Sequence, residues 1–145
     1  MFIKLNDELL NTTEVTTIKV NEFDENQLVY WFADGSFKKE NFDEATEVTE
    51  KIEEISTNNL LFVKISEKIL VNARFIKSLK QDVINPLRLV IEIYNGAPVK
   101  EKYENTGLVE SKKQEFETAI LKVKEMISNT DEESFILEGE EEIKG

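Results

Sequence analysis

A segment near the start of the chain returns in its second half. LVYWFADGSF at residues 28–37 resembles LVIEIYNGAP at residues 89–98. The likeness extends upstream in a constant register, because Asn11 falls on Asn72 and 24 residues separate the Asn from Gly35 or Gly96 in each half. Such agreement in apolar and turn positions indicates a duplicated supersecondary unit. The chain is therefore expected to fold as two similar units in tandem.

Each half carries runs typical of β-strands, such as FIKL, EVTTIKV and LVYWFA in the first. Asp34-Gly35 and Asn95-Gly96 are dipeptides that favour a two-residue type I′ hairpin turn. A hairpin is therefore predicted at the same place in both halves. In the first half, Val29 and Trp31 make the second side of their strand apolar as well. We expect these two residues to form an interface rather than to face water, since an indole ring buries a large apolar area.

A helix is predicted after each set of strands. Asn41 is the expected N-cap of the first, with Glu44 three residues later, and Ala45, Val48, Ile52 and Ile55 follow at helical spacing. For the second helix, Ser111 and Gln114 form a capping-box pattern. The apolar positions expected to follow are Phe116, Ala119, Ile120, Val123, Met126 and Ile127. Residues 102–110 are then expected to form an inserted loop before it.

The predicted fold class is α+β, with two tandem antiparallel β-meander-plus-helix repeats that share one core. The repeats are expected at residues 1–56 and 60–128, and residues 129–145 form an acidic C-terminal tail. One shared core is expected because a piece of about 60 residues buries too little surface to be stable alone.

Each repeat resembles the short flagellar proteins of the FlbD and SwrD type. The likeness rests on "FIKLN", then "LLN", then "ADG" and an acidic helix, and it covers most of residues 1–56 and less of residues 60–127. Its motifs are turn and core residues, so the resemblance implies a fold of strands followed by a helix.

The net charge of −12 is unevenly distributed along the chain. Residues 1–56 carry 14 acidic and 5 basic side chains, residues 57–128 carry 9 and 12, and residues 129–145 carry 7 and 1. Such asymmetry indicates electrostatic docking, although surface acids also keep proteins soluble. The residues expected to bind a partner are Glu22, Asp24, Glu25, Glu132, Glu133, Phe135, Ile136, Leu137, Glu140 and Glu141.

The tail places an apolar triplet, residues 135–137, among carboxylates. One interpretation is a disordered segment that orders in a partner's groove. A second is an edge strand on the protein's own sheet, or a segment packed under a helix. In a third, the tail covers a basic cluster of the second repeat, formed by Lys64, Lys68, Arg74, Lys77 and Lys80.

Cysteine and histidine are absent from the chain, which excludes disulfides, thiolate metal sites and the commonest general base. Neighbouring carboxylates such as Asp43 and Glu44 fall in predicted turns or on helix surfaces, where nothing raises a carboxyl pKa. No calcium loop or Gly-rich phosphate loop is present in the sequence. We therefore expect no enzyme, no catalytic residue, no cofactor and no metal site.

Three functions are weighed. The favoured one is a non-catalytic acidic protein that occupies a basic, nucleic-acid-binding surface of a protein partner, in the style of phage-encoded inhibitors of host defence. The second is a single-stranded nucleic-acid-binding module with an autoinhibitory acidic tail. The third is an assembly protein that forms homodimers through its sheet. With no apolar run long enough for a signal peptide or a membrane span, a soluble cytoplasmic protein is expected.

Overall fold

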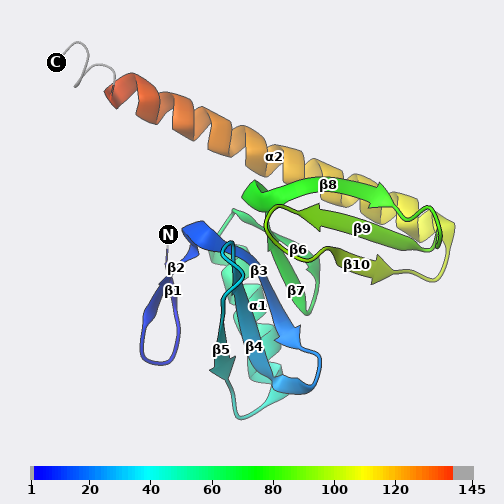
Figure 1. Cartoon of the computed structure of the whole chain (residues 1–145), viewed down its shortest axis with the longest axis horizontal. Coiled ribbons are helices and arrows are strands. Elements are labelled where there is room, and N and C mark those ends of the chain that lie inside the picture. Colours follow the sequence, from blue (N-terminus) through cyan, green and yellow to red (C-terminus); the bar gives the residue numbers. More distant parts are fainter. Residues whose placement is uncertain (1, 139–145) are drawn as a thin grey trace.

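The computed structural model describes residues 2–138 and confirms the α+β class (Figure 1). Two short 3-10 helices, η1 and η2, accompany the strands and the two α-helices. In the first half the elements are β1 (Phe2–Lys4), β2 (Leu9–Asn11), η1 (Thr12–Glu14), β3 (Val15–Asn21), β4 (Asp24–Phe32), β5 (Phe37–Asn41) and α1 (Ala45–Asn58). The second half continues with β6 (Phe62–Ser66), β7 (Ile69–Asn72), η2 (Ala73–Phe75), β8 (Ile76–Gln81), β9 (Arg88–Ile93), β10 (Val99–Lys102) and α2 (Thr106–Glu138).

The strands form three antiparallel sheets. The largest has the order β5-β4-β3-β7-β6, and the others are β10-β9-β8 and the hairpin β1-β2. The β6–β7 hairpin, which follows α1 in the chain, joins the sheet of the first half because β7 pairs with β3, with Ile18 opposite Leu70. The two halves are therefore tied together by backbone hydrogen bonds as well as by side chains.

The buried apolar side chains of the described residues form two clusters rather than the single shared core that was predicted. Alternation along the β6–β7 hairpin explains the division, since neighbouring residues of a strand point to opposite faces. Phe62 and Leu70 belong to the cluster that α1 covers, whereas Val63 and Val71 belong to the cluster that α2 covers. The β6–β7 hairpin therefore separates the two cores and contributes side chains to both.

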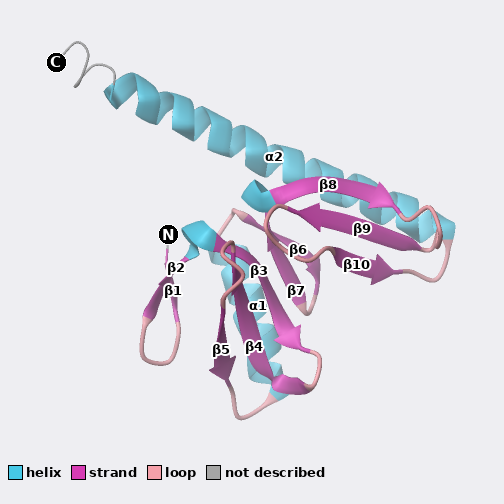
Figure 2. Ribbon diagram, in the orientation of Figure 1, coloured by secondary structure: helices cyan, strands magenta, loops and turns pink. Residues whose placement is uncertain are grey.

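Helix α1 covers one face of the large sheet (Figure 2). Its predicted apolar positions are confirmed, because Val48, Ile52 and Ile55 are buried. The predicted N-cap is wrong: Asn41 is the last residue of β5, where it pairs with Gln27, and the cap is Glu44. Glu44 forms a capping box with Glu47, which satisfies backbone N–H groups of the first turn.

Helix α2 begins at Thr106, five positions before the predicted capping box at Ser111. The Asn105 side chain accepts a hydrogen bond from the backbone N–H of Leu108 at 2.8 Å, which is the role of an N-cap. Only residues 103–105 separate β10 from α2, so the predicted loop over residues 102–110 is wrong. Phe116, Ile120 and Val123 are buried, as predicted.

The backbone of α2 continues to Glu138, beyond the predicted boundary at residue 128. At 1.5 Å per residue the helix is about 50 Å long, and it extends past the strands (Figure 1). Residues 129–138 are therefore helical, which corrects both the disordered tail and the edge strand that were considered. Glu and Leu, which have high helix propensity, favour this extension of the helix. Glu140 and Glu141 lie outside the described residues.

Both hairpin turns lie where the sequence predicts them, but neither is of type I′. That turn needs positive φ at both central residues. Gly35 has φ +89° whereas Asp34 is not in the left-handed region, and Asn95 has φ 59° whereas Gly96 is not. The connections are four residues long between β4 and β5 and five between β9 and β10, instead of two.

Candidate functional site

The outer face of the large sheet, opposite α1, carries aromatic and cationic side chains. Cross-strand register puts Lys19 opposite Val29 and Val29 opposite Lys39. In the next row, Thr17 lies opposite Trp31 and Trp31 opposite Phe37. Residues that face each other across strands share one face. The two lysine stems flank Val29, which is buried although no helix of the described chain covers it.

Trp31 and Phe37 form an aromatic pair on this face. Their ring centroids are 4.9 Å apart with the rings inclined by 49°, and the Lys39 ammonium lies 5.5 Å from the centre of the Phe37 ring. Trp31 is half-buried and Phe37 is 48% exposed. Trp31 belongs to neither hydrophobic cluster, so it is not a core residue. The prediction that Val29 and Trp31 form an interface stays a prediction.

A second cationic surface lies on the three-stranded sheet, on the face opposite α2. Lys80 is opposite Val90 and Val90 is opposite Lys100, while Arg88 is opposite Lys102. The flanking residues Leu89 and Ile91 point the other way, into the cluster under α2. Lys100 and Lys102 are exposed.

Two carboxylates accompany these cations. Glu92 accepts a hydrogen bond from the Ser78 hydroxyl and lies 3.3 Å from the Lys80 ammonium. The hydrogen bond from Ser78, followed by Lys80, lowers the pKa of Glu92. Asp82 pairs with Arg88, whose Nε donates to it at 2.7 Å, and this hydrogen bonding lowers the pKa of Asp82. Lys80 and Arg88 are therefore partly neutralised, whereas Lys100 and Lys102 form no ion pair with another residue of the described part of the chain.

The two surfaces are neighbours. Both helices lie behind the strands in Figure 2, so both outer faces are turned to the viewer. Thr17, Lys19 and Trp31 of the large sheet line a pocket together with the β9–β10 turn, residues 95–98. We call this combined surface the cationic sheet face, and it is defined by Lys19, Lys39, Lys80, Arg88, Lys100 and Lys102 with Trp31 and Phe37.

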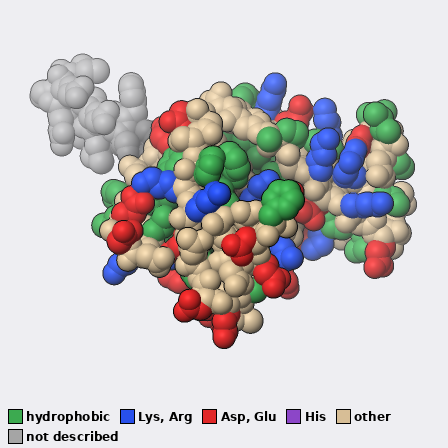
Figure 3. Space-filling view, turned by 60° about the horizontal axis from the view of Figure 1, so that its bottom comes forward, with side chains coloured by type: hydrophobic (Ala, Val, Ile, Leu, Met, Phe, Trp, Pro, Cys, Tyr) green, Lys and Arg blue, Asp and Glu red, His purple; other side chains and the backbone are tan. Residues whose placement is uncertain are grey.

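Acidic side chains gather at the β3–β4 turn, which borders the cationic sheet face, because Glu22 and Phe23 line a hollow together with Lys19, Trp31, Phe37 and Lys39. The β3–β4 turn carries Glu22, Asp24 and Glu25, three of the predicted partner-binding residues, around Phe23, which is 95% exposed. Asn26 donates to the backbone oxygen of Asp43 at 3.3 Å, which brings the start of α1 beside this turn. In Figure 3 Asp and Glu side chains gather on the lower part of the molecule, whereas Lys and Arg gather on the right.

The other predicted partner-binding residues are separate from this turn. Glu132, Glu133, Phe135, Ile136 and Leu137 lie in the last part of α2. The predicted basic cluster is also divided, because Lys64 pairs with Glu53 at 2.5 Å and only Lys80 belongs to the cationic sheet face. The structure brings Glu22, Asp24 and Glu25 together and leaves the α2 residues apart.

Sequence reasoning missed Lys19, Phe37 and Lys39 as neighbours of Trp31. They lie on three different strands, and only the register of the two hairpins brings them together. Alternation in SFKKEN did carry a signal, since Phe37 and Lys39 are two residues apart and share a face.

Comparison with solved structures finds a similar fold. The chain superimposes on the LytTr DNA-binding domain of a Bacillus cereus protein with a TM-score of 0.53 and 12% sequence identity, covering 83% of this chain and 94% of that chain. At this identity the likeness concerns the fold. No protein-family model matches the chain, and comparison with curated proteins finds no significant match. Within residues 2–138, neither helix is both long and apolar enough to span a bilayer.

Proposed function

We propose that this protein binds single-stranded nucleic acid, without catalysis, through the cationic sheet face. The observation that carries the proposal is an aromatic pair, half-buried Trp31 and exposed Phe37, beside a row that contains Lys19 and Lys39. Proteins that bind single strands combine a positive surface that follows the backbone with aromatic rings on which bases stack. The fold likeness to a domain described as DNA-binding supports the same class of ligand.

The net charge of −12 does not oppose this proposal at physiological salt. Carboxylates on the solvent side of α1, such as Glu47 and Glu50, lie behind the sheet by at least a helix diameter, about 10 Å. The Debye length at physiological ionic strength is about 8 Å. A strand on the cationic sheet face is therefore influenced mainly by the charges beside it, which are the lysines of the face and Glu22 at its border.

Charge-neutralising variants test the proposal. Lys39→Gln, Lys100→Gln and Lys102→Gln combined are expected to weaken binding of a labelled 12-nucleotide single strand and to lower the slope of log K against log salt by about 2. The matched control removes the same charge from α2, behind the sheets, with the replacements Lys112→Gln, Lys113→Gln and Lys122→Gln. Fluorescence anisotropy measures both. Equal weakening in the two triple variants, or no binding by the native protein, would refute the proposal.

A second candidate function is favoured by Phe23, an exposed aromatic ring within an acidic turn. The acidic turn fits a partner with a basic surface, and an inhibitor carried by a phage is one role of this kind. Pull-down from a bacterial lysate at low and high salt tests it, with Phe23→Ser as the variant. Recovery of the same proteins at both salt concentrations, or by Phe23→Ser as well as by the native chain, would count against this function.

Homodimer formation through Val29 and Trp31 competes with nucleic-acid binding for the same face. The molecular mass in solution, measured with and without a single strand, distinguishes the two functions. A dimer that closes this face must dissociate when a single strand binds. A monomer at all concentrations would leave no role for the face in assembly.

We also infer that the two halves are copies of one unit. The order of two strands, a 3-10 helix, three strands and an α-helix occurs twice. Asn11 and Asn72 support the inference, since each caps its 3-10 helix by accepting a hydrogen bond at 3.0 Å from the backbone N–H two residues on. The copies differ in that β6–β7 joins the large sheet whereas β1–β2 stands apart.

A further inference from the structure

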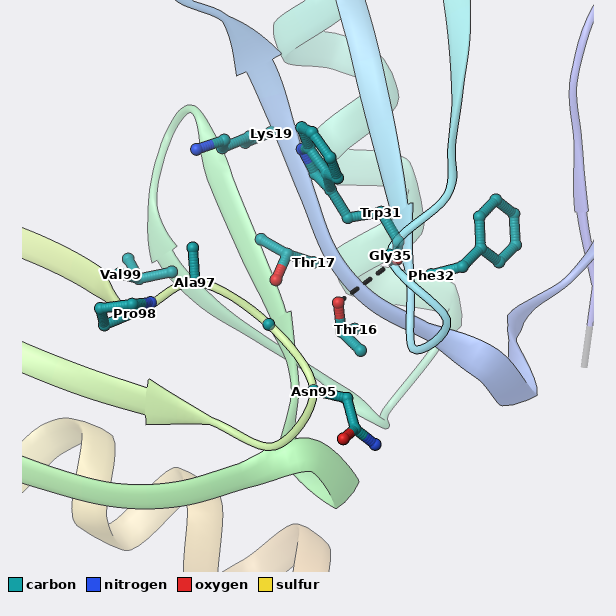
Figure 4. Close-up of a pocket in the computed structure, with 11 residues that line it drawn as sticks. Thr16, Thr17, Lys19, Trp31, Phe32, Gly35, Asn95, Ala97, Pro98 and Val99 are labelled. Carbon is teal, nitrogen blue, oxygen red and sulfur yellow. Dashed lines mark hydrogen bonds between the residues drawn. The ribbon is translucent and has the colours of Figure 1, made fainter.

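A pocket of about 210 Å³ lies where the cationic sheet face crosses from one half to the other (Figure 4). Thr17, Lys19 and Trp31 form one wall, and the β9–β10 turn with Ala97 and Pro98 forms the other. Pockets for drug-sized ligands measure roughly 300–1,000 Å³. This pocket suits a smaller group, such as one planar ring.

Trp31 gives the pocket a stacking surface. Phe37 packs against the indole at 4.9 Å, and Trp31 lines both the pocket and a hollow of about 320 Å³ on the Phe37 side. The indole N–H is shielded from solvent and makes no hydrogen bond within the described residues.

The opposite wall is a closely packed turn. Asn95 is held in the left-handed backbone conformation, with φ 59°. Gly96 packs so closely that an added Cβ would lie 3.3 Å from Ile93 Cγ2 and 3.8 Å from Thr16 Oγ1. A wall that is already in place loses little conformational entropy when a ligand enters.

We propose that this pocket takes one unstacked base of a bound single strand, which stacks on Trp31 while an adjacent phosphate lies near Lys19. The inference rests on the proposed function and identifies where one base is held. Charge favours this occupant, because Lys19 lines the pocket and Lys100 follows directly after Val99 on its rim. A base is flat, fits a small pocket and has a π-face that stacks on an aromatic ring.

Trp31 is the sole tryptophan of the chain, so its fluorescence reports on the pocket directly. Titration of the full chain with a 12-nucleotide oligo-dT is expected to quench Trp31 emission over the same concentrations that raise the anisotropy of the labelled strand. An oligonucleotide of equal length whose bases are replaced by abasic sites is expected to bind in a salt-dependent manner without quenching.

Ala97→Leu fills the pocket from an exposed turn position and replaces no residue of the strands. It is expected to weaken oligo-dT binding about tenfold, since stacking of one base is lost, and to leave abasic-strand binding unchanged. Ser111→Leu adds the same side chain at an exposed site on α2 and is the control.

The outcomes separate the two proposals. Binding of oligo-dT with unchanged Trp31 emission, or with native affinity in Ala97→Leu, would overturn the base pocket and leave the proposed function standing. Equal quenching by the abasic strand would also overturn the pocket. Absence of binding by either strand would overturn both.

Discussion

Tyr30 and Glu40 form a buried polar pair under the large sheet. The Tyr30 hydroxyl donates to Glu40 Oε1 at 2.7 Å, and the Lys51 ammonium lies 3.8 Å from Glu40 Oε2. Burial, and then the hydrogen bond to Glu40, raise the pKa of Tyr30, so the hydroxyl is protonated and donates to Glu40 at neutral pH. Tyr30→Phe leaves the carboxylate short of a partner and is expected to cost about 1–3 kcal/mol of unfolding free energy. Urea denaturation measures this.

Tyr94→Phe is the control for that change, since Tyr94 is 50% exposed. It is expected to change the unfolding free energy by less than about 0.5 kcal/mol. Equal losses in the two variants would contradict a stabilising role for the buried pair.

Glu101 links stability to pH. It lies on β10 opposite Leu89, and burial raises its pKa above the ordinary 4.5. Because the folded-state pKa is the higher one, this group's contribution to stability is complete below pH 4.5 and is lost as pH rises through the folded-state pKa. Glu101→Gln is therefore expected to raise the urea midpoint at pH 7 and not near pH 3.5. A gain of the same size at both pH values, or the same gain in the exposed Glu104→Gln, would contradict this.

At the scale of elements, the β6–β7 hairpin couples the two cores. Val71 is fully buried in the cluster under α2, while its neighbour Leu70 is fully buried under α1. Val71→Ala is expected to destabilise both halves together. The unfolding midpoint from Trp31 fluorescence, which reports on the first half, must then fall with the midpoint from far-UV circular dichroism, which α2 dominates. Leu60→Ala, at a 60% exposed position, is the control. A shift in circular dichroism alone would show that the cores unfold separately.

Periodicity predicted the strands and the buried faces of the helices, because each depends on a local pattern of apolar residues. Val48, Ile52 and Phe116 are buried as the spacing predicts. Helix starts were wrong because several polar residues compete for one cap, and Asn41 is used by β5 instead. Contacts between the halves were beyond the sequence, since Trp31 meets the turn at Ala97 only through tertiary packing.

The dependence on tertiary packing also explains why the candidate site was not predicted from the sequence. Sequence reasoning assigned charge by half and so described the first half as acidic. In the structure charge follows the faces, because alternation along β3 and β5 sends Lys19 and Lys39 outward while Glu40 points inward. The large net negative charge therefore coexists with a cationic surface.

Over the whole molecule, this arrangement makes binding depend on salt in an unusual way. At about 0.01 M salt the Debye length is about 30 Å, so a strand on the cationic sheet face is repelled by all the acidic groups, whereas at 0.15 M it is influenced mainly by nearby charges. Counterion release alone makes log K rise steadily as salt falls. We expect the plot of log K against log salt to flatten below about 50 mM salt for the native chain.

Removal of residues 129–145, which carry 7 acidic and 1 basic side chains, is expected to make that plot steeper below 50 mM and to change affinity little at 150 mM. Anisotropy titrations at four salt concentrations measure it. A full-length chain in which the seven acids are replaced by Asn and Gln separates charge from contact, because it must behave like the truncated chain if long-range repulsion is the cause. A gain in affinity that occurs only in the truncated chain would mean that the segment itself occupies the cationic sheet face. Identical plots for all three chains would contradict repulsion by the whole molecule.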